Sequence, residues 1–335
     1  MNDGAVADGT ISNAGVVCRP HPSCAICGRA GVSVHRGLRD RIFQVPGTWG
    51  LMRCPHEDCA LMWLDPMPLP DETAKFYDDY YTHAADAQTS VPAAPRRALW
   101  KSLLKRSLAT LLFWRRHSFM SGLSYLEGLA PGRLLEVGCG TGMLLRQATA
   151  AGWRAVGIDF DPVAIAAARS LQDVEARVGD LESMHFADGG FDAVVMNNVI
   201  EHLPLPQRVL EECRRILRPG GRLVLVTPNT RSLGYALYDQ DWRGLEVPRH
   251  LFLFSPATLL ALGRATGFSR LSAFSSAGAG TGVEMLLFSE ALRARRLGRE
   301  ATRNETGARR TIRREILSII LGHDIGEWAV LVAHR

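Results

Sequence analysis

The stretch that decides the fold is Leu134-Leu-Glu-Val-Gly-Cys-Gly-Thr-Gly-Met143. It begins as an apolar run typical of a buried parallel strand and continues into a glycine-rich turn and the start of a helical pattern. Glycines at such a turn let the backbone bend tightly and approach a ligand without a Cβ atom in the way. The N-terminus of the following helix offers unpaired N–H groups to a carboxylate or a phosphate. The stretch therefore predicts a strand–turn–helix unit with a ligand site at its turn.

Apolar runs alternate with helical patterns from Leu134 to the end of the chain. This alternation indicates βαβ units and a parallel sheet, which is the α/β fold class. We expect strands at residues 133–137, 155–158, 176–178, 191–196, 222–227, 271–274 and 329–332. We expect helices at residues 143–151, 162–170, 206–217 and 256–266, and three of these begin with a proline, which suits a first helical position. The predicted architecture is a seven-stranded, mostly parallel sheet with helices on both faces.

The spacing of the glycines discriminates between two kinds of nucleotide site. A dinucleotide fingerprint, G-x-G-x-x-G, would need its third glycine at Met143, so a dehydrogenase is disfavoured. The observed pattern resembles the first motif of class I S-adenosylmethionine-dependent methyltransferases, (D/E)-x-G-x-G-x-G, with matches at Glu136, Gly138, Gly140 and Gly142. The resemblance implies a Rossmann-like methyltransferase fold in which the glycine turn packs against the methionine half of S-adenosylmethionine.

Further segments match the same family in the same order. Asp159 ends the second expected strand, where the resemblance implies that it accepts both ribose hydroxyls. Asp180 follows the third strand and in that family lies near the adenine, although an aspartate here also suits a helix cap. Residues 197–204 follow the fourth strand, and residues 217–223 form the turn into the fifth. The predicted cofactor-binding residues are Glu136, Gly138, Cys139, Gly140, Gly142, Asp159, Phe160, Asp180, Leu181 and Asn197.

Four cysteines near the N-terminus have the composition of a metal site. They form one C-x2-C pair and one wider C-x4-C pair, at Cys24, Cys27, Cys54 and Cys59. Four thiolates suit tetrahedral Zn²⁺, which would supply folding energy to a segment too short to bury a core alone. A subset of class I methyltransferases is similar, with such a module followed by segments like residues 64–68 and 76–81. The alternatives are that His56 or Cys18 replaces a ligand, or that packing alone holds the module.

Two histidines follow strands at the end of the sheet where α/β proteins bind ligands. His202 follows the fourth expected strand next to Glu201, and His250 follows the fifth in a stretch that resembles one in the zinc-bearing subset. A base helps methyl transfer when the acceptor is a hydroxyl or an acidic carbon. The candidate catalytic residues are therefore His202, His250 and Glu201. The alternatives are that His250 orders a loop through a backbone hydrogen bond and that Glu201 only ends a helix.

The composition of the chain changes along its length. We expect a disordered leader at residues 1–17, a zinc-ribbon-like module at 18–66, a helical linker or cap at 67–128, and the methyltransferase domain at 129–335 with a helical insertion at about 283–322. Residues 100–119 suit an amphipathic helix that covers the cofactor cleft or lies on anionic lipid. The nine arginines within residues 293–314 suit a solvated helix face, an anionic-substrate patch or a membrane contact.

The net charge, the lengths of the apolar runs and the cysteine count limit the possible functions. The net charge of +5 over 335 residues is too small to indicate nucleic acid binding by itself. No stretch reaches the roughly 18 apolar residues that span a bilayer, and the leader lacks the basic segment of a secretory signal. An odd cysteine count of seven does not suggest a disulfide framework. We expect a cytoplasmic protein, with peripheral membrane contact as an option.

The predicted function is methyl transfer from S-adenosylmethionine to a small-molecule, sugar or lipid-linked acceptor, at oxygen in preference to carbon. Two alternatives stay open. One is an RNA or protein methyltransferase that holds its substrate with the arginine-rich insertion. The other is a cofactor-binding scaffold without catalysis.

Overall fold

The central sheet has seven strands in the order β10-β9-β8-β11-β12-β15-β14, and β15 is antiparallel to both of its neighbours. The computed structural model describes residues 5–6, 9–77 and 122–335. The strands are β8 (Arg133–Val137), β9 (Arg154–Asp159), β10 (Glu175–Val178), β11 (Phe191–Asn197), β12 (Leu217–Pro228), β14 (Ser269–Ser276) and β15 (Trp328–His334). Each expected strand lies within an observed one, and the predicted α/β class with a mostly parallel sheet is confirmed.

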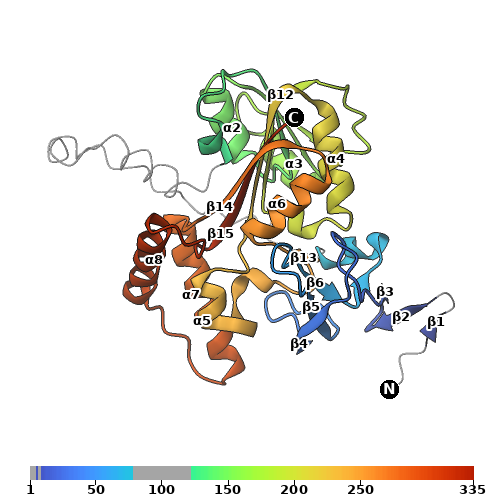
Figure 1. Cartoon of the computed structure of the whole chain (residues 1–335), viewed down its shortest axis with the longest axis vertical. Helices are drawn as coiled ribbons and strands as arrows, with labels where there is room; N and C mark the ends of the chain where they lie inside the picture. Colours follow the sequence, from blue (N-terminus) through green and yellow to red (C-terminus); the bar gives the residue numbers. More distant parts are fainter. Residues whose placement is uncertain (1–4, 7–8, 78–121) are drawn as a thin grey trace.

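Helices cover both faces of this sheet (Figure 1). One face packs against η3 (Gly122–Leu126), α2 (Met143–Ala150) and α3 (Pro162–Arg169), and the other against α4 (Pro206–Ile216) and α6 (Pro256–Ala265). Successive strand residues point to opposite faces, so Leu134 joins the first of these cores and Leu135 the second. The two hydrophobic layers hold the strand ends, and therefore the loops after them, in fixed positions.

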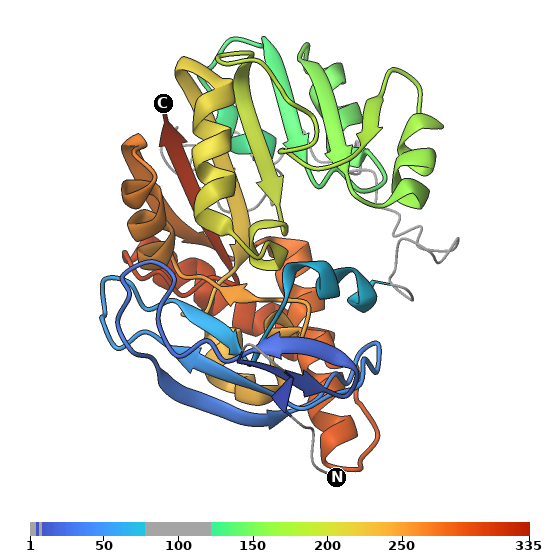
Figure 2. The same cartoon turned by 90° about the vertical axis from the view of Figure 1, so that its right-hand side faces the viewer.

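The cysteine-bearing segment at residues 18–66, called the cysteine module from here on, contains a sheet that a strand from the second half of the chain completes. Its order is β13-β6-β5-β4, with β4 (Val32–Leu38), β5 (Trp49–Arg53), β6 (Met62–Asp65) and β13 (Phe252–Leu253). Phe252 pairs with Trp63, so a strand from the second half of the chain closes the module's sheet. Buried residues of the module and of the α4–α6 face form one hydrophobic cluster. Figure 2 shows the module lying across the lower end of the central sheet.

A second small sheet has the order β1-β2-β3-β7 and contains most of the described part of the expected leader. Its strands are β1 (Ala5–Val6), β2 (Thr10–Asn13), β3 (Val16–Arg19) and β7 (Met67–Pro68). Ala14 and Gly15 join β2 to β3 with φ of 52° and 90°, as a type I′ hairpin turn requires. The prediction of disorder is wrong over residues 10–17, because the polar composition concealed a two-residue turn between short strands.

Residues 67–128 are described only at their two ends. β7, followed by η1 (Pro70–Phe76), occupies the first end, and η3 lies at the last. The strand β7 departs from the expected all-helical linker because it pairs with β3. The amphipathic helix expected at residues 100–119 lies outside the described residues.

The expected helical insertion consists of α7 (Ala279–Arg296) and α8 (Glu305–Ile320). Ile312 and Ile319 on the inner face of α8 pack with Val283 of α7. Beside them, Glu315 is fully buried next to Glu327, which precedes β15, and burial raises the pKa of both carboxyl groups. Among the described helices, none combines the length and the apolar character needed to cross a membrane.

Short elements complete the end of the sheet where the parallel strands terminate. They are η4 (Ile200–His202), α5 (Leu233–Tyr238), η5 (Asp239–Asp241) and η6 (Arg243–Leu245). The module lies at this same end, because the backbone N–H of Leu251 donates to the carbonyl oxygen of Glu201 and that of Leu64 donates to the carbonyl oxygen of Leu251. The ligand-binding end of the sheet is thereby bordered by the module on one side.

Candidate functional site

The glycine turn after β8 is open at its tip. Gly138, Gly140 and Gly142 all have positive φ, of 71°, 49° and 78°. A Cβ atom at Gly138 would lie 2.3 Å from Val199, and one at Gly142 would lie 3.0 Å from Ala168, so these two glycines are required by packing within the protein. A Cβ atom at Gly140 would meet nothing within 4 Å among the described residues. Gly140 therefore borders open space, as a backbone does where a ligand approaches it.

Asp159 connects the end of β9 to this turn. Its Oδ2 accepts the backbone N–H of Gly140 at 2.8 Å, and its Oδ1 accepts that of Asp161 at 3.0 Å. These two bonds hold the carboxylate beside the open tip, where each oxygen keeps a further lone pair for a hydroxyl donor. Burial raises the pKa of Asp159. The Asp159 side chain therefore faces the glycine turn. This is the orientation that the predicted ribose contact requires.

Buried polar atoms next to the turn have capacity for a ligand. The Oε2 atom of Glu136 and the Oδ1 atoms of Asn197 and Asn198 are buried and have no hydrogen-bond partner among the described residues. Burial, followed by the charge of Asp159, raises the pKa of Glu136 well above its usual range. A buried acceptor without a donor is costly, so these atoms fit a bound molecule that carries N–H or O–H groups.

The other predicted cofactor residues differ in their surroundings. Cys139 is 6% exposed and packs against Gly157, and burial raises the pKa of its thiol to about 12, as expected for a small buried residue. Asp180 is exposed, and its Oδ1 accepts the backbone N–H of Ser183 within a turn; no helix follows it among the described residues before β11, so it does not cap one. Leu181 is buried in the core, and Phe160 is 59% exposed beside Asp159.

His202, in η4 after β11, makes two polar contacts through one ring nitrogen. Its Nδ1 lies 3.1 Å from the carbonyl oxygen of Arg249 and 2.9 Å from the hydroxyl of Tyr77. A carbonyl oxygen only accepts, so the contact with Arg249 favours the tautomer in which Nδ1 carries the hydrogen and Nε2 keeps a lone pair, whereas the Tyr77 hydroxyl can either accept from or donate to the same nitrogen. Burial lowers the pKa of His202, which keeps the ring neutral. The ring is therefore prepared to take a proton at Nε2.

His250 and Glu201 lie next to His202. The rings of His202 and His250 are 4.7 Å apart, and Nδ1 of His250 lies 2.8 Å from the carbonyl oxygen of Gly244. Burial lowers the pKa of His250 to about 3 and raises that of Glu201 to about 8. The hydroxyl of Thr227 donates to Glu201 Oε2, whereas Oε1 has no partner among the described residues. One potential metal-ligand atom from each of Glu201, His202 and His250 lies within 4.8 Å of the others.

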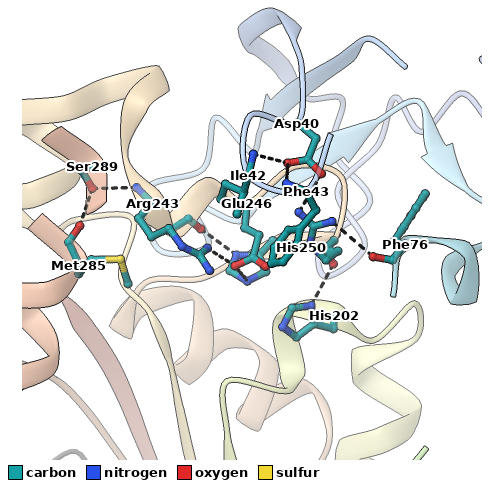
Figure 3. Close-up of polar contacts among 12 residues, drawn as sticks. Asp40, Ile42, Phe43, Phe76, His202, Arg243, Glu246, His250, Met285 and Ser289 are labelled. Carbon is teal, nitrogen blue, oxygen red and sulfur yellow. Dashed lines mark hydrogen bonds and ion pairs between the residues drawn. The ribbon is translucent and has the colours of Figure 1, made fainter. Parts of the chain in front are cut away.

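The carbonyl group that contacts His202 belongs to a buried arginine, Arg249. Figure 3 labels the residues around it, among them Asp40, Glu246 and Phe76. The guanidinium of Arg249 contacts Asp40 Oδ2 at 2.9 Å and Glu246 Oε1 at 3.1 Å, and its carbon lies 4.0 Å from the centre of the Phe43 ring. It also donates to the carbonyl oxygen of Phe76 at 3.4 Å. The Arg249 side chain is fully buried, so water does not stabilise its positive charge. That charge and the negative charges of Asp40 and Glu246 must therefore stabilise one another.

Glu246 balances this network electrostatically. Burial alone would raise its pKa, but the positive charge of Arg243, with contributions from His250 and Arg249, lowers it to about 2. Sequence reasoning missed Glu246, Arg249 and Tyr77. The only available signals were the charged residues within the stretch before His250 and the tyrosine within residues 76–81.

The four cysteines predicted as metal ligands converge. One Sγ atom from each of Cys24, Cys27, Cys54 and Cys59 lies within 4.8 Å of the other three, and the closest pairs are 3.4 and 3.5 Å apart. A Zn–S distance of about 2.3 Å in a tetrahedron corresponds to S···S distances of about 3.8 Å. The wider C-x4-C spacing is therefore compatible with a four-sulfur site, and neither Cys18 nor His56 joins this group among the described residues.

Replacing Arg249 tests whether the buried network holds the site together. Arg249→Met leaves the charges of Asp40 and Glu246 buried without their partner, so we expect a loss of about 3–5 kcal/mol in the free energy of unfolding. Arg309→Met is the control, because Arg309 is exposed and, among the described residues, pairs only with Glu305. Such surface pairs contribute at most ~1 kcal/mol. Urea titration measures both variants. Equal stability losses would contradict the account of the network.

Comparisons with known proteins place the central part of the chain in a family. Residues 112–273 match the model of a family described as a methyltransferase domain. The ubiquinone biosynthesis O-methyltransferase of Xanthomonas oryzae pv. oryzae is 36% identical over 115 residues, which are 32% of this chain and 48% of that protein. An uncharacterized 37.1 kDa protein in a Streptomyces fradiae transposon is 36% identical over 122 residues, which are 34% of each chain. The chain thus spans about half or less of the length of these curated relatives.

A solved structure of a Thermotoga maritima S-adenosylmethionine-dependent methyltransferase, a possible histamine N-methyltransferase, aligns with a TM-score of 0.45. That protein is 20% identical, and the alignment covers 68% of this chain and 96% of the other. The family match falls on the part of the chain that contains the glycine turn, Asp159 and His202. The chain therefore contains a methyltransferase domain of the class I S-adenosylmethionine-dependent family.

Proposed function

We propose that this protein transfers the methyl group of S-adenosylmethionine to a hydroxyl oxygen of a small, ring-bearing acceptor, and that His202 is the general base. The observation that carries the proposal is the contact between His202 Nδ1 and the Arg249 carbonyl oxygen, which favours the tautomer with an unprotonated Nε2. The first curated relative is named as an O-methyltransferase, which agrees with transfer to oxygen.

The cofactor side consists of the glycine turn, Asp159 and Glu136. When bound, the donor supplies a methyl group on a positively charged sulfur. Gly140 gives backbone access to the amino-acid end of the donor, and Asp159 accepts from its ribose hydroxyls. The Glu136 oxygen that lacks a donor suits the α-amino group.

On the acceptor side, His202 Nε2 takes the hydroxyl proton as the acceptor oxygen forms its bond to the methyl carbon. A bound donor would supply this methyl group by release of a neutral thioether, on which the electron pair of the broken carbon–sulfur bond would remain. The imidazolium that forms is stabilised by the negative charge of Glu246, which raises the pKa of His202 against the effect of burial. We assign to His250 and Glu201, which lie next to His202, the role of holding its ring in position.

Aromatic side chains border the proposed acceptor site. The rings of Tyr77 and Phe160 meet edge to face at 5.1 Å, and Tyr77 also contacts the ring of His202 at 6.0 Å. Phe160 remains 59% exposed, so one face is available to a ligand. An acceptor with a ring could stack there while its hydroxyl points to His202. A phenol suits this arrangement, because a phenolic hydroxyl is more acidic than an aliphatic one. A neutral histidine can therefore remove its proton more readily.

We also propose that Cys24, Cys27, Cys54 and Cys59 hold one structural Zn²⁺. Sulfur ligands and the four-coordinate arrangement suit zinc. The hydroxyl of Thr258 in α6 donates to the carbonyl oxygen of Cys59 at 2.5 Å. The second cysteine pair is therefore hydrogen-bonded directly to the methyltransferase domain. Losing the metal should therefore destabilise both parts of the chain.

Gly140→Ala tests the cofactor site. The new Cβ atom would enter the space proposed for the donor, so we expect calorimetry to show at least a tenfold loss of S-adenosylmethionine affinity. Gly128→Ala is the matched control, because Gly128 also has positive φ and no atom within 4 Å of its Cβ position. Both variants should lose about 1–2 kcal/mol of stability from backbone strain. A similar affinity for both variants, or wild-type protein that binds NAD instead, would overturn the assignment.

His202→Ala tests the proposed base. We expect turnover of a panel of phenols and catechols to fall by about 10²–10⁴-fold, with unchanged S-adenosylmethionine affinity. His323→Ala, at an exposed loop, should keep full activity. Because burial lowers the pKa of His202 below 6.5, wild-type activity should be level at neutral pH and fall only as acid protonates Nε2. Undiminished turnover by the alanine variant would remove His202 as the base.

Metal analysis tests the zinc site. Purified protein should contain about one zinc per chain, and Cys54→Ser should lower that content and the melting temperature together. Cys18→Ala should keep its zinc, because Cys18 is buried outside the four-sulfur group. Zinc-free wild-type protein with unchanged thermal stability is the outcome that rules the site out.

A further inference from the structure

The nine arginines of residues 293–314 divide into two groups. Six have partners within the chain. Arg293 and Arg296 pair with Asp241, Arg295 with the Arg41 carbonyl oxygen, Arg299 with Glu290, Arg303 with Glu284 and Glu305, and Arg309 with Glu305. The other three are Arg310, Arg313 and Arg314, which are exposed and pair with no acidic or other polar group within the part of the chain that the structure describes. The first group stabilises the insertion, and the second needs another explanation.

The outer face of α8 carries the second group. The inner face consists of Ile312, Glu315 and Ile319, which are buried against the rest of the protein. Positions three or four residues apart share a helix face, so Arg310, Arg313 and Arg314 lie opposite that inner face. Figure 1 shows α8 at the outer edge of the molecule. The packed inner face thus fixes the direction in which these arginines point.

Large aliphatic side chains continue the same outer face beyond the arginines. Leu317, Ile320 and Leu321 are 59%, 53% and 68% exposed. No acidic residue lies among them, since the acids of α8 are Glu305 at its start and Glu315 on the buried face. Exposed aliphatic residues beside uncompensated positive charge are unusual on a surface that meets only water.

We propose that this outer face of α8, defined as Arg310, Arg313, Arg314, Leu317, Ile320 and Leu321, docks the protein onto an anionic lipid surface. The arginines would contact lipid phosphates, and the three aliphatic side chains would enter the boundary between headgroups and acyl chains. This inference goes beyond the proposed methyl transfer and does not depend on which acceptor is methylated.

Charge and side-chain type favour lipid over other polyanions. RNA would engage the arginines, but aliphatic side chains offer bases no aromatic surface for stacking. An acidic protein surface would pair with the arginines but would leave Leu317, Ile320 and Leu321 without an apolar partner. A membrane with anionic headgroups complements both halves of this face at once.

Vesicle co-sedimentation tests the proposal with the full chain. Wild-type protein should bind vesicles of phosphatidylglycerol and phosphatidylcholine in equal parts, bind phosphatidylcholine alone weakly, and bind the anionic vesicles less at high salt while retaining a salt-resistant fraction. The triple variant Arg310→Gln, Arg313→Gln and Arg314→Gln should bind more weakly by about fivefold for each arginine removed. The variant Leu317→Ser, Ile320→Ser and Leu321→Ser should lose the salt-resistant part of binding.

The matched control is Arg177→Gln, Arg264→Gln and Arg270→Gln, which changes the net charge equally at exposed positions on other elements. It should bind vesicles like the wild type. All variants should keep wild-type affinity for S-adenosylmethionine, which separates a docking defect from misfolding and from failure of the proposed function. Wild-type protein that ignores anionic vesicles or retains RNA instead, or α8 variants that bind like the control, would overturn the proposal.

Discussion

The rest of the site depends on one buried cation, the guanidinium of Arg249. Removing it from water is costly, and the cost is offset only because Asp40, Glu246 and the ring of Phe43 surround it. Asp40 and Phe43 come from the cysteine module, whereas Glu246 comes from the loop after β12. The module and that loop must therefore fold together, and their joint position directs the Arg249 carbonyl oxygen at His202.

The two halves of the site have different structural origins. The proposed cofactor half comes from the strand ends β8, β9 and β11, which the two hydrophobic cores hold in place. The proposed acceptor half comes from η4, from Tyr77 and from the loop that ends at His250, which the module borders. A metal at the four cysteines would therefore act at a distance, by keeping Asp40 and Phe43 in position beside Arg249.

The sequence predicted the features that depend on local pattern. Strand positions, helix-starting prolines and the glycine turn follow from periodicity and backbone geometry, and the structure has them where expected. Arg249 and Tyr77 escaped prediction because their roles arise from contacts with residues 209 and 125 positions away. The β2–β3 hairpin was missed because a two-residue Ala14-Gly15 turn leaves little trace in a polar stretch. The arginines of the insertion divided into two groups only once their partners were known.

The most direct measurement of the central claim is a crystal structure of the complex with S-adenosylhomocysteine. We predict that its amino-acid end lies against Gly140, that its ribose hydroxyls contact Asp159, and that its sulfur lies on the side of the site that contains His202 and Tyr77. A nucleoside bound elsewhere, or a sulfur pointing away from His202, would contradict the account.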